Sequence, residues 1–437
     1  YKHHTNFAIE QIEQTFLGER DFGKRIRCKL DRKADLLANM YLAFDIIDNT
    51  SGDDYGYAHN IYKFGFKIID YVEIEIGGQV IDRHYGEWMD IWTQLTYSSS
   101  KYSTLMSLLK DKEGKFTNRN NSYIYVPLMF WFNIEPGLAL PLISLQYHEV
   151  VLYLHIKSKD QIKYIYDTTD SNELVTFTDK YQNFLLGKYT KQPLSVNTSV
   201  GGDKLSFFSD DVSNTKSDNR WKLDNFSGSI KDIYLFCDYI FLDTEERKLF
   251  ANNAHEYLIE QVQRTNKLGL DTLSSTVTTK NKQFELDFNH PVKEIIWTVN
   301  SDLLENTHIY KNMDLTDTLG NILLQMNGID RIKKREVSFY NMIQPFQYHT
   351  CGGLIENSGR YYNGGFYMYS FGLFPEKINP SGTLNFSKLN NFLINFDYNK
   401  TSNTYSEIDE GYTFTCYARN YNILKIANGM AGLVYKN

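Results

Sequence analysis

The chain has few cysteines for its length, four in 437 residues, and they lie far apart in the sequence. No two of them form a C-x-x-C pair. The spacing therefore predicts free thiols and a reducing compartment rather than a disulfide framework. The four residues are Cys28, Cys237, Cys351 and Cys416.

Long apolar runs and an excess of positive charge are also missing. A membrane-spanning helix needs about 18–20 consecutive apolar residues, and the nearest candidate, residues 124–147, is interrupted by polar residues and prolines. The 46 Lys and Arg residues are outnumbered by 53 Asp and Glu, which gives a net charge of −7. Because binding to phosphates needs clustered cations, we expect no direct nucleic-acid partner and interpret the basic run 331–335 as a solvated loop end.

Motifs for catalysis are absent too, since the sequence contains no GxGxxG, Walker loop, GxSxG or HExxH. The close pair His349 and Cys351 lacks the further ligands that a zinc site needs, and we interpret it as a loop histidine beside a packed cysteine. Glu73 and Glu75 share one face of a predicted strand, which we expect to be the solvent side rather than a glycosidase cleft. Three carboxylate pairs lie in polar stretches, where solvated charge is expected: Asp53-Asp54, Asp210-Asp211 and Glu245-Glu246. The sequence thus predicts no catalytic residue, no cofactor and no metal.

What the chain does contain is a set of landmarks that occurs twice in the same order. Two of the three recur at an offset of 250 residues, and the third recurs at 244. Such self-similarity predicts a duplicated domain. The paired landmarks are residues 9–15 and 259–265, Gly78 and Gly328 with their following Asp-Arg, and the segments 136–154 and 380–396.

Alternation of apolar and polar residues over short segments is the dominant pattern. Aromatic residues make up 15% of the chain, with 33 Tyr and 28 Phe, and they favour half-buried pleated surfaces. Many short strands separated by turn residues indicate a sandwich or barrel rather than a βαβ plan. Strands are expected at 9–18, 25–30, 71–76, 123–126, 129–132, 149–156, 233–242 and 414–417.

Helical patterns are few. Residues 87–95 and 102–109 are each expected to form a short helix on a loop, and the acidic start of 243–251 predicts a helix between the halves. The aromatic segment 85–92 is interpreted as a helix pinned over the end of a sandwich and as part of a subunit contact, in preference to a sugar-stacking surface.

The same patterns predict the domain boundaries. A first domain covers 1–243, a linker helix 244–254 and a second domain 255–437. The first domain contains a long polar excursion at about 157–231, which is expected on the surface with a strand at 174–177. Six N-x-S/T triplets matter only if the chain enters a glycosylating compartment. Asn197 and Asn225, in the excursion, are the candidate acceptors; the other triplets begin at Asn49, Asn120, Asn385 and Asn399.

A series of segments in both halves forms a recognisable set. It comprises residues 4–10, 72–85, 136–150, 238–244, 255–261, 289–291, 369–371, 380–387, 420–425 and 428–435. In this order and number, the segments resemble the major capsid proteins of the nucleocytoplasmic large DNA viruses, and most closely the algal-virus and giant-virus branch. The chain departs from the family in a longer polar excursion and in Met430-Ala431-Gly432, where the family has Met-Gly-Gly.

The resemblance implies an all-β fold of two consecutive eight-stranded antiparallel jelly rolls, with no enzymatic activity. It implies a homotrimeric capsomer that tiles the icosahedral shell of a virion around an internal membrane, assembled in the host cytoplasm. Three copies of a two-roll subunit provide six similar wedges and hence a near-hexagonal outline. The outward tower of this capsomer is expected to come from 157–231, together with 98–122.

The partners implied are further copies of the chain, neighbouring capsomers, minor capsid and penton proteins and, indirectly, the viral membrane; a host glycan or receptor stays open. The alternative reading is a carbohydrate-binding, lectin-like double β-sandwich, because jelly rolls are common in lectins. An enzyme built on sandwiches is a third reading that no paired catalytic motif supports.

Overall fold

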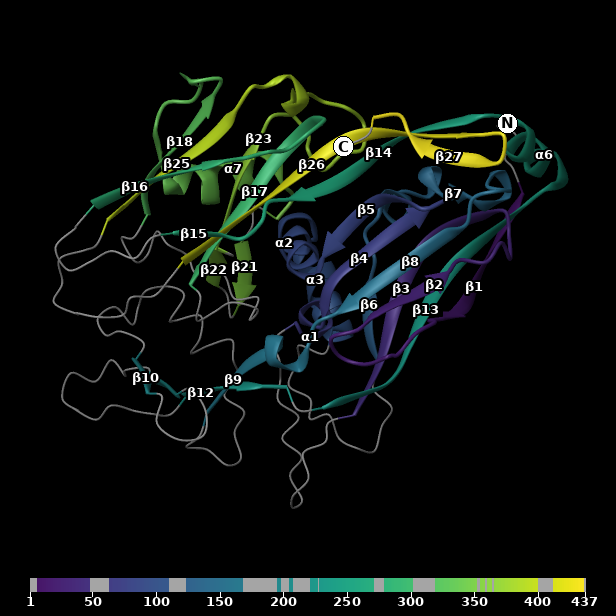
Figure 1. Cartoon of the computed structure of the whole chain (residues 1–437), viewed down its shortest axis with the longest axis horizontal. Helices are drawn as coiled ribbons and strands as arrows, with labels where there is room; N and C mark the ends of the chain where they lie inside the picture. Colours follow the sequence, from purple (N-terminus) through teal and green to yellow (C-terminus); the bar gives the residue numbers. More distant parts are fainter. Residues whose placement is uncertain are drawn as a thin grey trace, which may run out of the picture.

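Two β-sandwiches lie side by side in the computed structural model of the chain, with short helices between them (Figure 1). The structure describes residues 6–47, 63–109, 123–167, 195–197, 204–206, 221–226, 228–270, 279–301, 319–351, 354–357, 360–363, 365–399 and 412–435.

The first sandwich, called roll 1, consists of two antiparallel sheets. One has the order β1 (Phe7–Thr15), β13 (Ser229–Leu242), β3 (Leu36–Ile47) and β6 (Ile124–Pro127), with β7 (Leu140–Pro141) also paired to β3. The other has the order β2 (Arg25–Lys29), β8 (Val150–Ile156), β4 (Ile69–Ile76) and β5 (Gln79–Tyr85).

The second sandwich, called roll 2, repeats this plan. Its first sheet has the order β14 (His255–Arg264), β26 (Tyr412–Ala427), β17 (Pro291–Ser301) and β23 (Phe366–Ser370), with β15 (Leu268–Leu270), β24 (Leu384–Asn385) and β27 (Met430–Leu433) attached. Its second sheet has the order β16 (Thr279–Glu285), β25 (Phe392–Asn399), β18 (Leu319–Met326) and β19 (Ile329–Asp330), with β20 (Arg335–Glu336) attached.

The two rolls correspond strand for strand along these paths. The order β1-β13-β3-β6 has the same sequence of connections as β14-β26-β17-β23, and β2-β8-β4-β5 matches β16-β25-β18-β19. The eight-stranded plan of each half is the predicted one. It agrees with the duplicated landmarks, because the turns at Gly78 and Gly328 join the corresponding hairpins β4–β5 and β18–β19.

Alternation explains why these segments are strands. In β8 the side chains alternate between buried and half-buried, and in β2 between exposed and buried, as expected for a strand with one face on a core. The core of roll 1 continues into roll 2, where it includes Ile259, Tyr417 and Leu424. A second core lies within roll 2 around Trp297 and Tyr367.

The helices are α1 (Phe64–Lys67), α2 (Gly86–Thr96), α3 (Ser99–Leu108), α4 (Trp131–Ile134), α6 (Thr244–Asn252) and α7 (Gln344–Tyr348), and the turn η6 (Phe339–Ile343) is π-helical. The three helices expected from the sequence are therefore present. No helix among the described residues is long and apolar enough to cross a membrane.

The strand predicted at 129–132 is wrong, although the burial of its aromatic residues is as expected. The segment turns into α4 because the Asn133 side chain accepts a hydrogen bond from the Phe130 N–H at 3.2 Å and donates one to the Ala38 carbonyl at 2.7 Å. These two bonds fix a helical turn where alternation alone indicates a strand.

The polar excursion contributes a separate four-stranded sheet of short strands. Figure 1 shows it beyond one end of the rolls, on the side opposite to the C-terminus. The strand expected at 174–177 lies outside the described residues. The sheet has the order β10 (Ser195–Asn197), β11 (Lys204–Ser206), β12 (Trp221–Asn225) and β9 (Lys163–Asp167).

Candidate functional site: the interface between the two rolls

Helix α2 is the element that joins the rolls. It begins directly after β5, at Gly86, where a Cβ atom would lie 2.1 Å from the carbonyl oxygen of Phe66. Only glycine permits this close approach. The helix is then anchored in roll 1 by a buried ion pair between Asp90 and Lys63 at 2.6 Å.

The aromatic side chains of this segment face roll 2. The rings of Trp88 and Tyr85 lie 5.4 Å and 6.3 Å from the ring of Tyr417, and Glu87 accepts a hydrogen bond from the Tyr417 hydroxyl at 2.7 Å. Trp88 and Trp92 are only 2% and 7% exposed. The sugar-stacking reading of 85–92 is therefore wrong, because solvent does not reach the tryptophans, and the interpretation of a helix pinned against a sandwich is correct.

The edge strands β5 and β14 meet next to this helix. Gln261 donates from its side-chain amide to the Ile81 carbonyl, and the Val262 N–H donates to Asp82 at 3.0 Å. These contacts satisfy backbone groups that the strand edges would otherwise expose. The Arg264 guanidinium lies 3.6 Å from the centroid of the Tyr85 ring.

The C-terminal hairpin β26–β27 closes the far end of the same interface. The Tyr147 N–H donates to the Gly429 carbonyl at 2.9 Å, and the Ala431 N–H donates to His148 Nδ1 at 3.1 Å. The interface between the rolls thus runs from α2 through β5 and β14 to this hairpin, and we call it the inter-roll interface.

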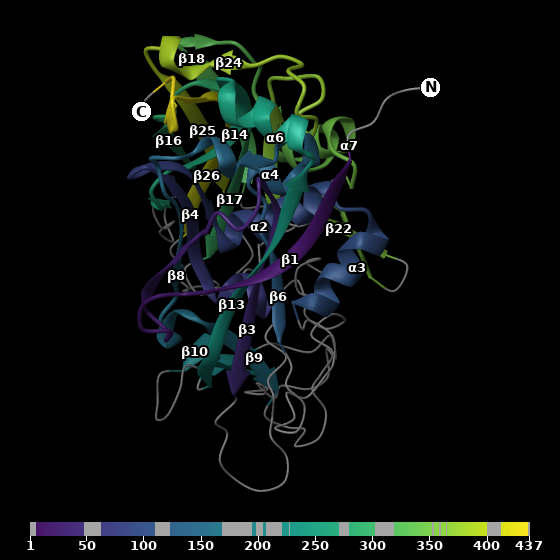
Figure 2. The ribbon, with the colours of Figure 1, turned by 90° about the vertical axis from the view of Figure 1, so that its right-hand side faces the viewer.

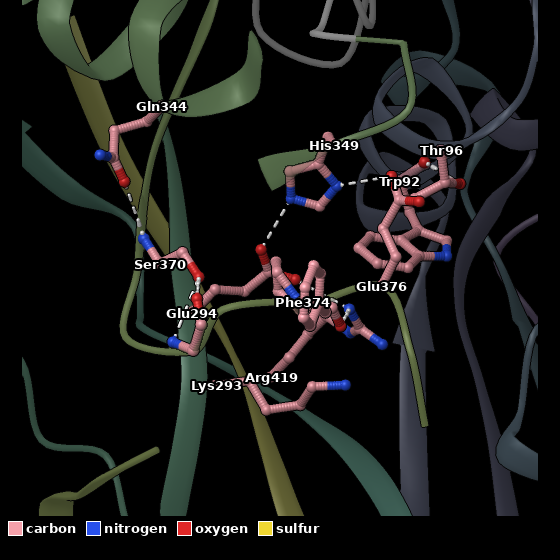
Figure 3. A network of polar contacts seen from close by, with 12 residues as sticks. Trp92, Thr96, Lys293, Glu294, Gln344, His349, Ser370, Phe374, Glu376 and Arg419 are labelled. Carbon is pink, nitrogen blue, oxygen red and sulfur yellow. Dashed lines mark hydrogen bonds and ion pairs between the residues drawn. The ribbon is translucent and has the colours of Figure 1, made fainter. Parts of the chain in front are cut away.

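A group of buried charged side chains lies next to Trp92 of α2 (Figure 3). The group combines three carboxylates with three basic side chains, so its charges balance when the histidine is protonated. We call it the charge network; its members are Glu260, Lys293, Glu294, His349, Glu376 and Arg419.

Arg419 is the centre of the charge network. Its guanidinium pairs with Glu294 at 2.8 Å and with Glu260, donates to the Pro375 carbonyl at 3.0 Å, and lies 3.8 Å from the Trp92 ring centroid. The arginine therefore connects β14, β17 and the segment after β23 to helix α2 of roll 1. Burial lowers the pKa of Arg419, but the two carboxylates outweigh it and keep the pKa above its usual value.

Glu294 and Lys293 are neighbours in β17, yet both are buried. A register shift between Val292 and Glu294 places an extra residue in the strand and breaks the usual alternation. Burial would raise the pKa of Glu294, but His349 and Arg419 lower it to about 2. For Lys293, burial dominates over the attraction of Glu260 and lowers the pKa to about 8.

His349 lies between two carboxylates. Its Nε2 is 2.8 Å from Glu294 and its Nδ1 is 3.0 Å from Glu376, which also accepts hydrogen bonds from the N–H and hydroxyl of Thr350. Burial lowers the pKa of His349, but Glu294 and Glu376 outweigh it and raise the pKa. His349 lies in the loop after α7, as interpreted, but the sequence did not indicate its two carboxylate partners, which come from segments distant in the chain.

Cys351 also contributes to the inter-roll interface. Its N–H donates to the Leu95 carbonyl at 3.0 Å, at the end of α2, and its thiol lies against the Tyr97 carbonyl. All four cysteines have free thiols, as predicted, and Cys237 and Cys416 lie on the corresponding strands β13 and β26. Within the described ranges no group of three or more His, Cys, Asp and Glu side chains is arranged to hold a metal ion.

The expectation that Glu73 lies on a solvent face is wrong. Its carboxylate is 1% exposed and pairs with Arg25 at 2.7 Å and with Arg83. Those two long side chains lie over it from β2 and β5, and both also cover tyrosine rings. Glu75, two residues along the strand, is half-buried. The two carboxylates therefore face no shared cleft.

A cavity of about 590 Å³ borders the charge network on the side of α3. Its wall includes Tyr41 and Tyr97 from roll 1, Lys101 from α3, and Glu260 and Arg419 from roll 2. The network is therefore close to solvent on this one side.

Helix α6 follows β13 and is attached to roll 1. Asp35 pairs with Arg247 at 2.7 Å and accepts a hydrogen bond from the Leu242 N–H at 2.9 Å. Glu245 and Glu246 lie in its first turn, where the positive end of the helix dipole stabilises their carboxylates. The pairs Asp53-Asp54 and Asp210-Asp211 lie outside the described residues.

The candidate glycosylation positions differ in their setting. Asn197 ends β10 and Asn225 ends β12, in the sheet of the polar excursion. Asn385 caps a short helical turn by accepting a hydrogen bond from the Ser387 N–H at 3.1 Å. The triplets at Asn49 and Asn120 lie outside the described part of the chain.

Comparison with known proteins gives a consistent result over the whole chain. Residues 1–243 match the family described as major capsid protein N-terminus, and residues 246–432 match the family described as large eukaryotic DNA virus major capsid protein. The major capsid protein of Pyramimonas orientalis virus is 32% identical over 457 residues, which cover 100% of this chain and 92% of that protein. The major capsid protein of Paramecium bursaria Chlorella virus 1 is 31% identical over 483 residues, covering 100% and 93%.

Solved structures show the same likeness. The structure of the PBCV-1 virus capsid superposes with a TM-score of 0.68 at 28% identity and covers 100% of this chain and 98% of the other. The Faustovirus major capsid protein superposes with a TM-score of 0.63 at 12% identity, covering 98% and 92%, and this likeness concerns the fold alone.

Proposed function

We propose, from the premise that this chain belongs to the family of major capsid proteins of large eukaryotic DNA viruses, that three copies form a pseudo-hexagonal capsomer that tiles an icosahedral shell. Members of this family are structural proteins and not enzymes, and the chain builds the capsid of the virion. The capsid role follows from membership of the family, whereas the trimer and the tiling are what we propose.

One observation supports the proposal that the chain forms a trimer. The strand orders of roll 1 and roll 2 correspond position by position, so one chain contains two wedges of the same kind. A closed ring of such wedges needs repeated contacts between unlike faces, and three two-wedge chains complete a six-wedge ring.

The domain division that we propose is 1–243, 244–254 and 255–437. It is supported by the helix Thr244–Asn252 between β13 and β14 and by the boundaries of the two matched families. Neighbouring capsomers are the natural partners of a capsid lattice. We further propose contacts with minor capsid and penton proteins and, through them, with an internal membrane. Assembly in the host cytoplasm is part of the same proposal and agrees with the free thiols.

The trimer is tested by the solution mass of the purified chain. Light scattering is expected to give a stable species of three times the 51.1 kDa chain mass, and electron microscopy of concentrated samples is expected to show hexagonal arrays. A strict monomer at high concentration would contradict the capsomer.

A further inference from the structure

We infer that the cavity beside the charge network is a binding site for a small amphipathic cation, namely a primary ammonium group on an aliphatic chain. The cavity of about 590 Å³ lies between helix α3, strands β3 and β6 of roll 1 and the charge network of roll 2. Figure 2 shows α3 on the outside of the molecule, next to β6. The site is an addition to the capsid role and does not depend on the trimer.

The roll 1 side of the cavity provides an apolar wall. It contains Met40, Leu105, Leu128 and Met129, and each of these residues is at most 5% exposed. Ligand sites in proteins typically have volumes of about 300–1,000 Å³ and combine apolar walls with a few polar groups. Because transfer of apolar surface out of water is favourable, this wall suits an aliphatic chain.

The roll 2 side provides two carboxylates. Each oxygen of Glu260 accepts one hydrogen bond, from Lys293 or from Arg419. On Glu376, Oε2 accepts one hydrogen bond, from the Thr350 hydroxyl at 2.6 Å. A carboxylate oxygen has two acceptor positions, so three of these oxygens each keep one position for a donor that is not among the described residues. An ammonium group has the donors that such positions need.

The charges of the wall favour a cation over an anion. The guanidinium of Arg419 is buried and already shared between Glu260 and Glu294. An anion in the cavity would therefore approach Glu260 and Glu376 as a third negative charge. Repulsion between charges is poorly screened where water is scarce, so we expect an anion with the same aliphatic chain to bind more weakly.

The aromatic rings of the wall already bind cations from the chain itself. The Lys101 ammonium lies 3.9 Å from the centroid of the Tyr97 ring, and the Arg419 guanidinium lies 3.8 Å from that of Trp92. All four residues line the cavity. Ring faces attract cations through their quadrupole. Since Lys101 is exposed on α3, its ammonium marks the solvent side of the site, and the carboxylates mark the inner side.

A ligand in this cavity would contact both rolls at once. Its chain would pack on Leu105 and Leu128 of roll 1, and its ammonium would bind Glu260 and Glu376 of roll 2. These groups come together only when the rolls are packed against each other. A ligand that binds the folded state alone stabilises it, so occupancy of the site is expected to strengthen the inter-roll interface.

Calorimetric titration of the purified chain tests the site with three probes: octylammonium, hexylammonium and octanoate. Octylammonium is expected to bind saturably, with one ligand per chain. Each buried CH₂ group contributes roughly fourfold to affinity, so hexylammonium is expected to bind roughly 15-fold more weakly. Octanoate is expected to bind at least about tenfold more weakly because of the two carboxylates. Equal binding of octanoate and octylammonium, or affinity independent of chain length, would overturn the inference.

A substitution in the cavity wall locates the binding. Thr104 is exposed on α3 and lines the cavity, so Thr104→Trp is expected to obstruct it and to lower the affinity for octylammonium at least about tenfold. The control is Ser107→Trp, at an exposed position of the same helix outside the cavity lining. Each hydroxyl donates to the carbonyl four residues earlier at 3.1 Å, so both variants lose an equivalent hydrogen bond.

The control variant is expected to keep its affinity within about twofold, and circular dichroism checks that both variants fold. Unchanged affinity in Thr104→Trp, or an equal loss in the two variants, would overturn the assignment of the cavity. The site and the trimer fail separately. A trimer that does not bind octylammonium contradicts this inference alone, whereas a monomer that binds it saturably contradicts the capsomer alone.

Discussion

At the scale of single residues, Arg419 contributes to the stability of the inter-roll interface in a way that no pattern in the sequence indicates. It compensates two buried carboxylates, Glu260 and Glu294. Removing one partner of a buried ion pair leaves an uncompensated charge, which costs about 3–5 kcal/mol. We therefore expect Arg419→Met to lower the free energy of unfolding by about this amount in chemical denaturation.

The control for Arg419→Met is Lys425→Met on the same strand. Lys425 pairs with Glu256 at 2.9 Å, but both side chains are more than half exposed. Exposed ion pairs contribute about 0–1 kcal/mol, so this variant is expected to change the stability only slightly. Equal losses in the free energy of unfolding of the two variants would show that burial of the charge network does not increase the contribution of Arg419 to stability.

The charge network also predicts how stability depends on pH. The pKa of Glu294 is lowered from 4.5 to about 2, so its contribution is complete above pH 4.5 and is lost as the pH falls towards 2. The pKa of His349 is raised above 6.5, so its contribution is complete below pH 6.5 and is lost as the pH rises through the raised value.

His349→Gln tests the alkaline side of this dependence. As the pH rises above 6.5 and His349 loses its proton, the melting temperature of the unmodified chain is expected to fall. The variant is expected to be less stable at pH 6.5 and to show a flatter profile. Parallel profiles for the two proteins would exclude His349 as the titrating group.

The residue scale is also where sequence reasoning fails. His349, Glu73 and Arg419 are polar residues in apolar surroundings, and their partners lie tens to hundreds of positions away in the chain. Local patterns place such residues on a loop or a solvent face because alternation does not report on distant partners. The segment 129–132 fails for a related reason, since one side-chain amide, that of Asn133, overrides the alternation.

At the scale of elements, the prediction from sequence is much better. Strands with one buried face and a helix with an acidic start have local signals, and β2, β4, β8, β13 and α6 lie where those signals indicate. The landmark glycines also identify the hairpins correctly, because a tight turn with positive φ at Gly78 and Gly328 requires that residue type. What these elements bind could not be read locally: α2 looks like a loop helix until the second roll is placed beside it.

Helix α2 depends on the small size of its first residue. In Gly86→Ala the new Cβ would meet two backbone carbonyls, those of Phe66 and Ile69, at 2.1 Å and 2.4 Å. Because backbone cannot rotate away, we expect a loss of about 1–3 kcal/mol in the free energy of unfolding.

Gly137→Ala provides the comparison for Gly86→Ala. Its added Cβ would meet only the end of the Glu135 side chain, at 3.7 Å, so stability is expected to change by less than about 0.5 kcal/mol. A tolerated Gly86→Ala would mean that α2 can shift without disturbing its contacts with roll 2.

At the scale of the whole molecule, the polar excursion begins and ends in the core of roll 1, where Ile162 and Phe226 are buried. Its sheet β9–β12 lies beyond one end of the rolls (Figure 1). We propose that the excursion, together with 98–122, forms the outward tower of the capsomer, that Asn197 and Asn225 accept glycans there, and that the tower is where a host glycan or receptor would bind. Mass spectrometry of peptides from virion protein tests the glycans, and unmodified asparagines at both positions would exclude them.

Deleting residues 160–229 tests the tower at the same scale. The shortened chain is expected to fold and to keep the mass of a trimer, because the sheet of the excursion is separate from the sheets of both rolls. Light scattering and electron microscopy measure the outcome. Loss of the trimer would show that the segment takes part in assembly and is not decoration alone.

The open side of β1 has a consequence for the chain before assembly. An edge strand offers a row of unpaired N–H and C=O groups to any other strand, and exposed apolar side chains such as Ile9 would stabilise such pairing. Glu10 and Glu13 are exposed on the same strand, and their like charges oppose the pairing of two β1 strands from different chains. The negative charge along this edge therefore opposes fibrous aggregation of newly made subunits.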